Sequence, residues 1–311
     1  MEERNRVIAL GFFDGVHKGH GALLRRATQQ AEELGCIPAA FTFDAPPTQV
    51  ILGQKPALLT TPTERADLMR RLYGIQDVVV AHFDDRMMHM NWRDFVVEIL
   101  VKRHNAIHLV AGHDYRFGYR GEGTPERLMT LCSELGIGCD IISPVEVDHI
   151  RISSSYIRTL VAQGEMERAM EFLGHPYTLT DQVRHGKRIG TRLGFPTMNL
   201  QLPPESVVPA FGVYATRVWV DGTAYLAATN VGVRPTVGDD RPVTVEGSLM
   251  DFSGDLYGKT VRMEFYRRIR PEQKFDSLDE LRTHIARDVQ TVRTYFRTME
   301  TTLSNFNLLE L

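Results

Sequence analysis

The chain has 311 residues, enough for about two domains that each bury a core of their own. Its 36 Lys and Arg against 39 Asp and Glu give a formal net charge of −3, which provides no general attraction for nucleic acid or anionic membranes. Three cysteines without paired spacing argue against a disulfide framework or a thiolate zinc site. The sequence shows no signal peptide and no stretch long enough to span a bilayer, so we expect a cytoplasmic protein.

Short β-rich runs alternate with amphipathic helical stretches in the first half of the chain. The runs lie at residues 6–13, 37–43, 77–83, 106–112 and 139–145. The first helical stretch ends at Gly35, and its apolar face consists of Leu23, Leu24, Ala27, Ala31 and Leu34. The second begins at a capping box of Thr61 and Glu64 and ends at Gly74, and others follow at 91–104 and 124–136. This order predicts a parallel sheet covered by helices on both faces.

Strand patterns dominate the second half, after a short helical pair at 153–174 that we expect to close the first domain. Two runs flank Asp221 and Gly222, which predict a two-residue hairpin turn, and further runs lie at 242–252 and 259–269. A last helix follows a capping box of Ser277 and Glu280, and its apolar face consists of Leu278, Leu281, Ile285, Val289, Val292 and Phe296. The pattern predicts a small antiparallel barrel or sandwich with this helix packed on it, and domains of residues 1–180 and 181–311.

The string GFFDGVHKGH, residues 11–20, joins the first strand to the first helix, where a parallel sheet binds ligands. Its three glycines allow a close backbone approach, and the start of a helix offers N–H groups to phosphate. His17 and His20 stand three residues apart and can donate hydrogen bonds to phosphate oxygens, which would stabilise charge on a pentacovalent α-phosphate. The two histidines could instead merely cap the helix, and the string alone leaves both interpretations open.

These ten residues resemble the HxGH signature of the nucleotidylyltransferase superfamily and, through FDGVH, the bacterial FMN adenylyltransferase module. GHDYRFG at 112–118 and ISSSYIR at 152–158 are similar to later segments of the same module. The serines of the second segment suit triphosphate binding, although an ordinary serine cap followed by a solvated arginine gives the same pattern. The resemblance implies catalytic roles for His17 and His20, flavin contacts from Asp114 and Phe117, and ATP phosphate contacts from Gly11, Phe13, Asp14, Gly15, Ser153, Ser154 and Arg158.

One segment and two single positions depart from the family pattern. The string TFDAPP at 42–47 stands where the family usually shows TFxPHP, so Ala45 and Pro46 occupy the place of the expected histidine. Phe12 replaces a small polar residue before FDG, and Ser155 stands for a threonine. These departures bear on the rate of adenylyl transfer or on the shape of the FMN pocket.

A second group of motifs begins with HGKRIGTRLGFPTMNL at 185–200, which is glycine-rich and basic and could cover a polyphosphate. In it Thr197 and Asn199 offer oxygen ligands to Mg²⁺, while a surface turn leading into a strand is the alternative. In VTVEGSLMDF, alternation alone favours a solvent-facing Glu246 on an exposed strand face.

Together with GVYA at 212–215, NVGVRPT at 230–236, VTVEGSLMDFSGDLYG at 243–258 and RIRPEQKFDSLDEL at 268–281, the string resembles the riboflavin kinase domain over nearly all of residues 181–298. Gly247 differs from the bulkier residue usual in that family. The resemblance implies that Glu246 is the general base that takes the proton of the ribityl 5′-hydroxyl. It also implies Mg²⁺ ligands in Thr197 and Asn199, a flavin contact in Arg234, and phosphate contacts in Gly186, Lys187, Gly190 and Gly194.

Over essentially its whole length the chain resembles bacterial bifunctional riboflavin kinase/FAD synthetase. The resemblance implies a Rossmann-like nucleotidylyltransferase domain with a parallel sheet, followed by a small antiparallel β-barrel kinase domain with a C-terminal helix. It implies ATP with Mg²⁺, riboflavin, FMN and FAD as ligands, and no tightly bound prosthetic group, nucleic acid, membrane or obligate protein partner.

Three alternatives stay open. One is a kinase with an impaired adenylyltransferase, which the TFDAPP departure suggests, and another is a flavin-binding regulator without chemistry. The third is a class I synthetase-like enzyme acting with RNA, for which the sequence lacks a KMSKS-like string and a strongly basic domain.

Overall fold

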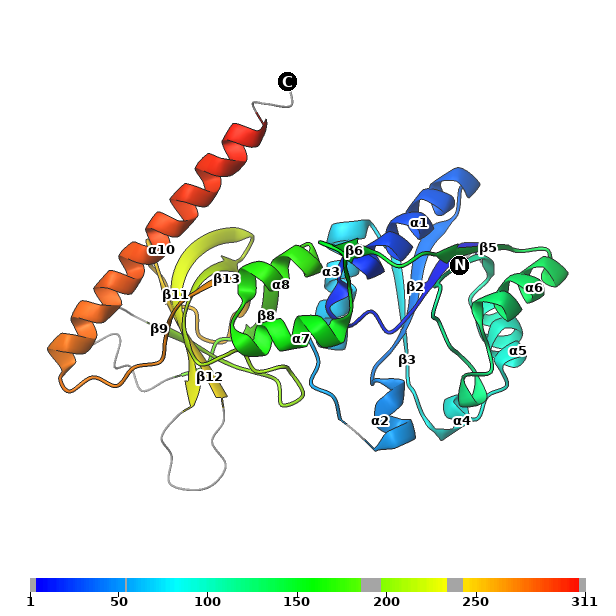
Figure 1. Cartoon of the computed structure of the whole chain (residues 1–311), viewed down its shortest axis with the longest axis horizontal. Helices are drawn as coiled ribbons and strands as arrows, with labels where there is room; N and C mark the ends of the chain where they lie inside the picture. Colours follow the sequence, from blue (N-terminus) through cyan, green and yellow to red (C-terminus); the bar gives the residue numbers. More distant parts are fainter. Residues whose placement is uncertain (1–3, 54, 186–196, 234–242, 308–311) are drawn as a thin grey trace. The chain divides into compact units, whose positions relative to one another are not determined.

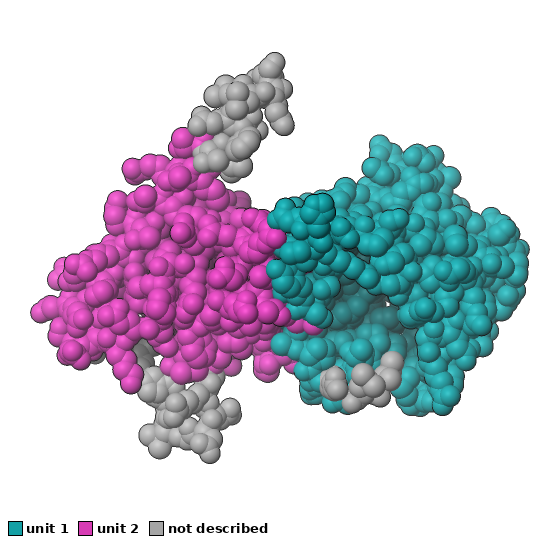
Figure 2. Space-filling view, viewed as in Figure 1, with its two compact units in different colours: residues 1–156, 172–174 teal, residues 157–171, 175–311 magenta. Residues whose placement is uncertain are grey.

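A computed structural model describes residues 4–53, 55–185, 197–233 and 243–307 (Figure 1). The chain forms two compact units, shown in different colours in Figure 2. Unit 1 consists of Met1–Tyr156 and Phe172–Gly174, and unit 2 of Ile157–Glu171 and His175–Leu311. Most of the helical pair, α7 (Ser154–Gln163) and α8 (Met166–Leu173), thus makes its contacts with the second unit.

A five-stranded parallel sheet forms the centre of unit 1, in the order β3-β2-β1-β4-β5. Its strands are β1 (Arg6–Leu10), β2 (Ile37–Phe43), β3 (Asp77–Ala81), β4 (Ala106–Gly112) and β5 (Gly138–Ile142), so all five predicted strands are confirmed. The chain reverses its direction of winding between β1 and β4. The carboxyl ends of these two strands therefore form the crevice in which such sheets bind ligands.

Helices cover both faces of this sheet. Successive strand residues point to opposite sides, and because both sets are apolar, both faces must be buried. Val7 and Ala9 pack on one side against α1 (Lys18–Leu34) and α3 (Pro62–Tyr73), and Ile8 and Leu10 pack on the other. The second face is covered by η2 (Phe95–Arg103) and α6 (Pro125–Leu135). The shorter elements are η1 (Asp14–Val16), α2 (Pro47–Leu52), α4 (Asp85–Met88), α5 (Trp92–Asp94), η3 (Tyr119–Gly121), β6 (Glu146–Val147) and β7 (Ile150–Arg151).

The predicted helices of unit 1 are confirmed with two differences, one in how a helix is divided and one in which residues are buried. Thr61 and Glu64 form the capping box of α3, and Gly35 and Gly74 end their helices in the left-handed conformation. The helix expected at 91–104 is divided into α5 and the π-helical η2. Leu34, which was expected on the buried face of α1, is 47% exposed.

Six antiparallel strands form the sheet of unit 2, in the order β8-β13-β10-β11-β12-β9. They are β8 (Tyr177–Gln182), β9 (Thr197–Gln201), β10 (Gly212–Val220), β11 (Thr223–Val233), β12 (Val243–Leu249) and β13 (Thr260–Pro271). The two edges meet at a bridge between Arg184 and Asn199, which makes the sheet a small barrel, as predicted. Asp221 and Gly222 both have positive φ, 47° and 83°, which confirms the predicted two-residue hairpin.

The last helix, α10 (Leu278–Asn307), lies on the outer face of the barrel. Val292 and Phe296 pack there against Val213 and Tyr266, which confirms the predicted docking. The backbone N–H of Glu280 donates to Ser277, but the Glu280 carboxylate accepts from Asp276 instead of completing the expected box. Leu278, expected on the apolar face, is 63% exposed.

The barrel interior explains the glycine at position 247. A Cβ there would lie 2.8 Å from the methyl carbon of Met198 and 3.2 Å from that of Met263. We expect Gly247→Val to lower the free energy of unfolding by about 1–3 kcal/mol, because the packed interior must shift to admit the side chain. Urea unfolding measures this, with Thr223→Val, at an exposed strand end, as the control. A wild-type midpoint for Gly247→Val would contradict the prediction.

Candidate active sites

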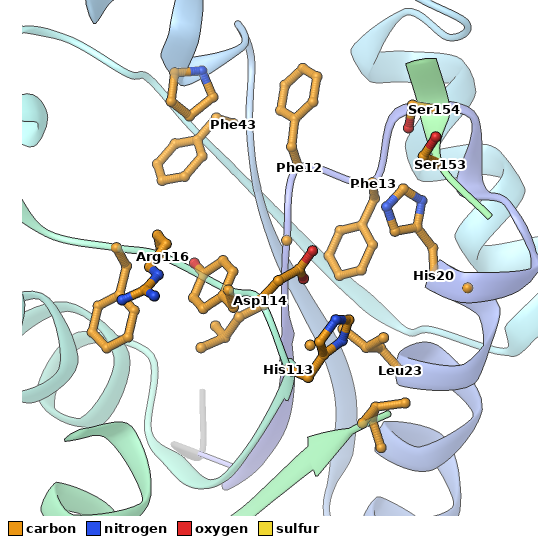
Figure 3. A pocket seen from close by; sticks show the side chains of 18 of the residues that line it. Phe12, Phe13, His20, Leu23, Phe43, His113, Asp114, Arg116, Ser153 and Ser154 are labelled. Carbon is orange, nitrogen blue, oxygen red and sulfur yellow. The ribbon is translucent and has the colours of Figure 1, made fainter. Parts of the chain in front are cut away.

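A cavity of about 760 Å³ opens at the carboxyl ends of β1 and β4 in unit 1. Figure 3 shows the labelled side chains that converge on it: Phe12, Phe13 and His20 from the end of β1 and the start of α1, Asp114 and Arg116 from the segment after β4, and Ser153 and Ser154. The cavity therefore lies where the sheet order predicts a ligand. It brings together residues more than a hundred positions apart in the sequence.

The loop between β1 and α1 has a strained backbone held by distant partners. Phe13 and Val16 have positive φ, 58° and 44°, which residues with side chains seldom adopt. The carboxylate of Asp14 accepts hydrogen bonds from the backbone N–H groups of Leu59 at 2.9 Å and Thr60 at 3.1 Å. Asp14, which the sequence placed among the phosphate contacts, is thus 2% exposed and anchors the loop without lining the cavity.

Gly15 lies at φ 76° in the same loop, and its N–H donates to the Thr60 hydroxyl at 3.0 Å. A Cβ at this position would lie 2.7 Å from the Cδ1 of Leu59, and the left-handed φ itself favours glycine. Gly15 supports the loop and, like Asp14, is absent from the cavity wall.

His17 and His20 both line the cavity, and their rings stack with centroids 3.5 Å apart. His17 is the N-cap of α1, because its Nδ1 accepts the backbone N–H of His20 at 3.2 Å. In a neutral imidazole whose Nδ1 accepts, Nε2 carries the proton and is a donor. Capping therefore leaves His17 with a donor nitrogen, so capping and phosphate binding are compatible roles.

The second histidine of the motif is held neutral by its surroundings. Burial lowers the pKa of His20 well below its usual range, and the neighbouring His17 and Arg65 add to the effect. A histidine whose folded pKa is lowered binds a proton more readily in the unfolded chain, so the free energy of unfolding begins to fall as pH drops below about 6.5 and goes on falling until pH reaches the lower folded pKa.

We therefore expect the NMR signals of His20 to stay in the neutral form through the pH range near 6.5 in which an ordinary histidine titrates. The reason is the desolvation of its imidazolium form. His82 is the reference in the same spectrum: its bond to Asp44 raises its pKa, so its signals should titrate with a midpoint above 6.5. A His20 resonance that shifts with a midpoint at or above 6.5 would contradict the neutral assignment.

Ser153 and Ser154 line the cavity beside this motif at the start of α7. Ser153 Oγ accepts the backbone N–H of Tyr156 at 3.3 Å, which is the helix cap that the sequence left open. Ser154 Oγ donates to the carbonyl of Asp14 at 3.0 Å and so joins the two phosphate motifs. Arg158 lies on α7 in unit 2, and its role in phosphate binding stays a prediction.

The other end of the cavity is aromatic. Phe117, 7% exposed, stacks on Tyr115 with centroids 5.5 Å apart, and the wall continues with Phe12, Phe43, Phe83, Met87, Met90 and Phe95. Asp114 lines the same space and forms an ion pair with Arg151 at 2.5 Å. A broad apolar pocket with a few polar groups suits a flat aromatic ligand.

The segment that lacks the expected histidine also bounds this cavity. Phe43 and Pro47, at the end of β2 and the start of α2, belong to its wall. Between them Asp44 turns away to His82, whose Nδ1 lies 2.5 Å from its carboxylate. Phe43 and Pro47 themselves agree with the family pattern, whereas Ala45 and Pro46, which stand at the place of the expected histidine, are not among the residues that line the cavity.

Unit 2 contains a second pocket of about 300 Å³ between the outer face of the barrel and α10. Strand register places Glu246 on β12 directly opposite Asn199 on β9 and Asn230 on β11. Residues paired in this way share a face of the sheet. Thr197, two residues before Asn199, shares that face, lies opposite Ser248 and lines the pocket with Glu246.

This geometry answers the two questions that the sequence left open here. Glu246 is half-buried in a pocket covered by α10, so it is not a solvent-facing residue of a bare strand. Thr197 and Asn199 lie within β9 and not in a surface turn. The sequence missed Asn230 and the pair of Arg270 and Asp288, which line the pocket and are joined by hydrogen bonds of 2.9, 3.2 and 2.7 Å.

The donor set of this face suits a hard cation. Threonine hydroxyl, asparagine amide and glutamate carboxylate all offer oxygen, which Mg²⁺ prefers. No group of three or more His, Cys, Asp and Glu side chains in the described ranges is arranged as a metal site. Five predicted residues, Gly186, Lys187, Gly190, Gly194 and Arg234, lie outside the described residues.

The parallel domain, with its cavity beside the glycine-rich loop, and the barrel, with Glu246 in its pocket, have the architecture of a two-site enzyme of nucleotide chemistry. The family model described as FAD synthetase matches residues 1–156, and the one described as riboflavin kinase matches residues 173–296. The chain belongs to the bifunctional riboflavin kinase/FMN adenylyltransferase family.

Individual relatives agree with this assignment. The Bacillus subtilis protein named bifunctional riboflavin kinase/FMN adenylyltransferase is 36% identical over 95% of this chain and 94% of its own length. The Escherichia coli protein of the same name is 35% identical over 93% and 92%. A crystal structure titled as a macrolide-efflux protein from Streptococcus pneumoniae shares the fold, with a TM-score of 0.83 and 31% identity over 94% of this chain and 95% of that one. That title names a different activity, whereas both family models and the sequence relatives agree with one another.

Among the helices of the described ranges, none has the length and apolar character needed to cross a membrane.

Proposed function

We propose that the chain phosphorylates riboflavin to FMN in unit 2 and adenylylates FMN to FAD in unit 1, using ATP in both reactions. The observation that carries the proposal is the pairing of two separate sites: the cavity that gathers both histidines and both serines, and the pocket that holds Glu246. We propose the functional boundary near residue 180, with residues 1–180 and 181–311 carrying one activity each. A cytoplasmic location stays a prediction from the sequence.

In unit 1 the aromatic end of the cavity holds the flavin ring, with Phe117 and Asp114 as contacts. The FMN phosphate then attacks the α-phosphate of ATP in line, and pyrophosphate leaves. His17 Nε2–H, His20, the hydroxyls of Ser153 and Ser154, and Arg158 stabilise the charge that develops on the reacting phosphates. Gly11 and Phe13 shape the loop that receives them, with Gly15 and Asp14 as its anchors.

In unit 2 Glu246 accepts the proton of the ribityl 5′-hydroxyl as that oxygen attacks the γ-phosphate of ATP. Thr197 and Asn199 would hold Mg²⁺, which when bound neutralises charge on the phosphates. Gly186, Lys187, Gly190 and Gly194 contact the same phosphates in this proposal, and Arg234 contacts the flavin. Asn230, paired with Glu246 across the strands, orients its carboxylate.

A chromatographic time course with purified protein, riboflavin and Mg-ATP tests the proposal. FMN that rises and then gives way to FAD supports both activities. FMN that accumulates without FAD would overturn the adenylyltransferase half, and stoichiometric flavin binding without ATP consumption would overturn both.

A further inference from the structure

Arg65 is a charged side chain buried completely behind the wall of the unit 1 cavity. It lies on α3 at 0% exposure, and its Nη1 donates to the Thr42 hydroxyl at 3.0 Å and to the Phe43 carbonyl at 2.9 Å. Its Nε and Nη2 have no hydrogen-bond partner among the residues that the structure describes. A buried guanidinium with unpaired nitrogens is costly, so its presence calls for a role other than stability.

Two routes connect Arg65 to the phosphate loop. Its guanidinium carbon lies 4.1 Å from the centre of the Phe12 ring, within the range of a cation–π contact. The Thr42 hydroxyl, which accepts from Arg65, donates in turn to the Phe12 carbonyl at 2.8 Å. Phe12 and Phe43 both line the cavity, and Phe12 directly precedes the left-handed Phe13. Arg65 thus fixes the residue on which the strained turn begins.

The charge of Arg65 persists at neutral pH. Burial lowers its pKa to about 10, and the nearby carboxylates of Asp14 and Asp44 oppose that shift. His20 is the titratable group of α1 that faces Arg65, and the positive charge of Arg65 lowers its pKa. In a water-poor interior a fixed charge interacts more strongly with its neighbours than it would in solvent.

We propose that Arg65 is a positioning residue of the adenylyltransferase site, which fixes the Gly11–Phe13 backbone through Thr42 and Phe12 and places a buried positive charge behind the part of the cavity wall that Phe12 and Phe43 form. The inference rests on the proposed adenylyltransferase function. It assigns the group no contact with substrate, because Arg65 lies behind the side chains that form the wall.

The first test is Arg65→Met, which keeps an unbranched side chain and removes the planar, charged guanidinium group. We expect kcat for FAD formation from supplied FMN to fall at least about tenfold, with KM for ATP changed less than about threefold. Phosphorylation of riboflavin by the same preparation should be unchanged. Arg65→Lys keeps the charge without the planar guanidinium and should recover part of the lost kcat.

A double-mutant cycle tests the connection to the loop. Phe12→Leu keeps an apolar cavity wall and removes the ring that faces the guanidinium. If the two residues act together, the combined variant should lose clearly less in kcat than the product of the two single losses. Losses that multiply would overturn the route through Phe12.

Arg26→Met is the matched control, since Arg26 also lies in unit 1 and pairs with Asp140 at 2.6 Å but does not line the cavity. It should form FAD at the wild-type rate. A folded Arg65→Met with wild-type kcat, or with only a raised KM for ATP or a lowered thermal midpoint, would overturn the proposal.

If Arg65→Met does not fold, Arg65→Lys decides the question. Reduced kcat at a wild-type thermal midpoint supports positioning, and wild-type kcat overturns it. A wild-type protein that forms no FAD contradicts the proposed function itself, so the two failures are distinguishable.

Discussion

Glu246→Gln is expected to lower the rate of FMN formation by about 10²–10⁴-fold, the usual contribution of a general base. The amide keeps the size and the hydrogen-bonding reach of the side chain, so the register of β12 with β9 and β11 should survive. What is lost is the group that accepts the proton of the ribityl hydroxyl. Conversion of supplied FMN to FAD should continue at the wild-type rate, because that cavity is lined by residues of unit 1.

Two measurements are needed, the rate of FMN production from riboflavin and the rate of FAD production from FMN, each at saturating Mg-ATP. Glu167→Gln is the matched control: Glu167 belongs to unit 2, has a half-exposed side chain, and faces Arg267 rather than the pocket. A folded Glu246→Gln that has lost both activities would contradict separate sites. One that retains FMN formation would remove Glu246 from the role of base.

The strands of unit 1 and their parallel sheet could be predicted because they depend on local patterns, whereas the order of the strands in the sheet was not predicted. Each parallel strand is an apolar run bounded by helix caps such as Thr61 and Gly74, and both caps are formed as expected. The segment after β2 shows the limit of this approach. The six residues of α2 have too few turns to show helical periodicity, and Pro47 at its start gave no prediction of a helix.

Contacts between distant residues could not be predicted in this way. Asp14 stands in the phosphate motif, and its anchoring role depends on Leu59 and Thr60, which lie 45 and 46 positions away. Arg65 stands three and four positions before Leu68 and Met69 and so shares the buried face of α3, although an arginine is ordinarily solvated. What a periodicity argument does not contain is its partners at the end of β2, the Thr42 hydroxyl and the Phe43 carbonyl.

The kinase pocket depends on register in the same way. Motif resemblance identified Glu246, Thr197 and Asn199 separately, but their shared face requires β9 and β12 to pair so that Glu246 lies opposite Asn199, 47 positions earlier. A shift of one residue would turn Glu246 into the barrel interior. Once the register is known, the contribution of Asn230 follows from its place opposite Glu246.

His17→Asn separates the capping role that the structure gives to His17 from its proposed role as a donor to phosphate. Asparagine is a good N-cap, so the start of α1 should be preserved and the free energy of unfolding should change by less than about 1 kcal/mol. The imidazole donor is removed, and FAD formation should fall by about 10²–10³-fold, as when one donor to a developing oxyanion is lost. Riboflavin phosphorylation should be unchanged.

His17→Ala and His89→Asn complete this experiment. Alanine removes both the cap and the donor, so it should lose activity like His17→Asn and also about 1 kcal/mol of stability. His89, exposed and stacked on Tyr119 away from the cavity wall, should tolerate asparagine with no change in FAD formation. If His17→Asn forms FAD at the wild-type rate while His17→Ala is only less stable, the imidazole has no role in phosphate transfer. The motif would then serve to cap the helix, and its phosphate site would consist of the helix N–H groups, His20 and the two serines.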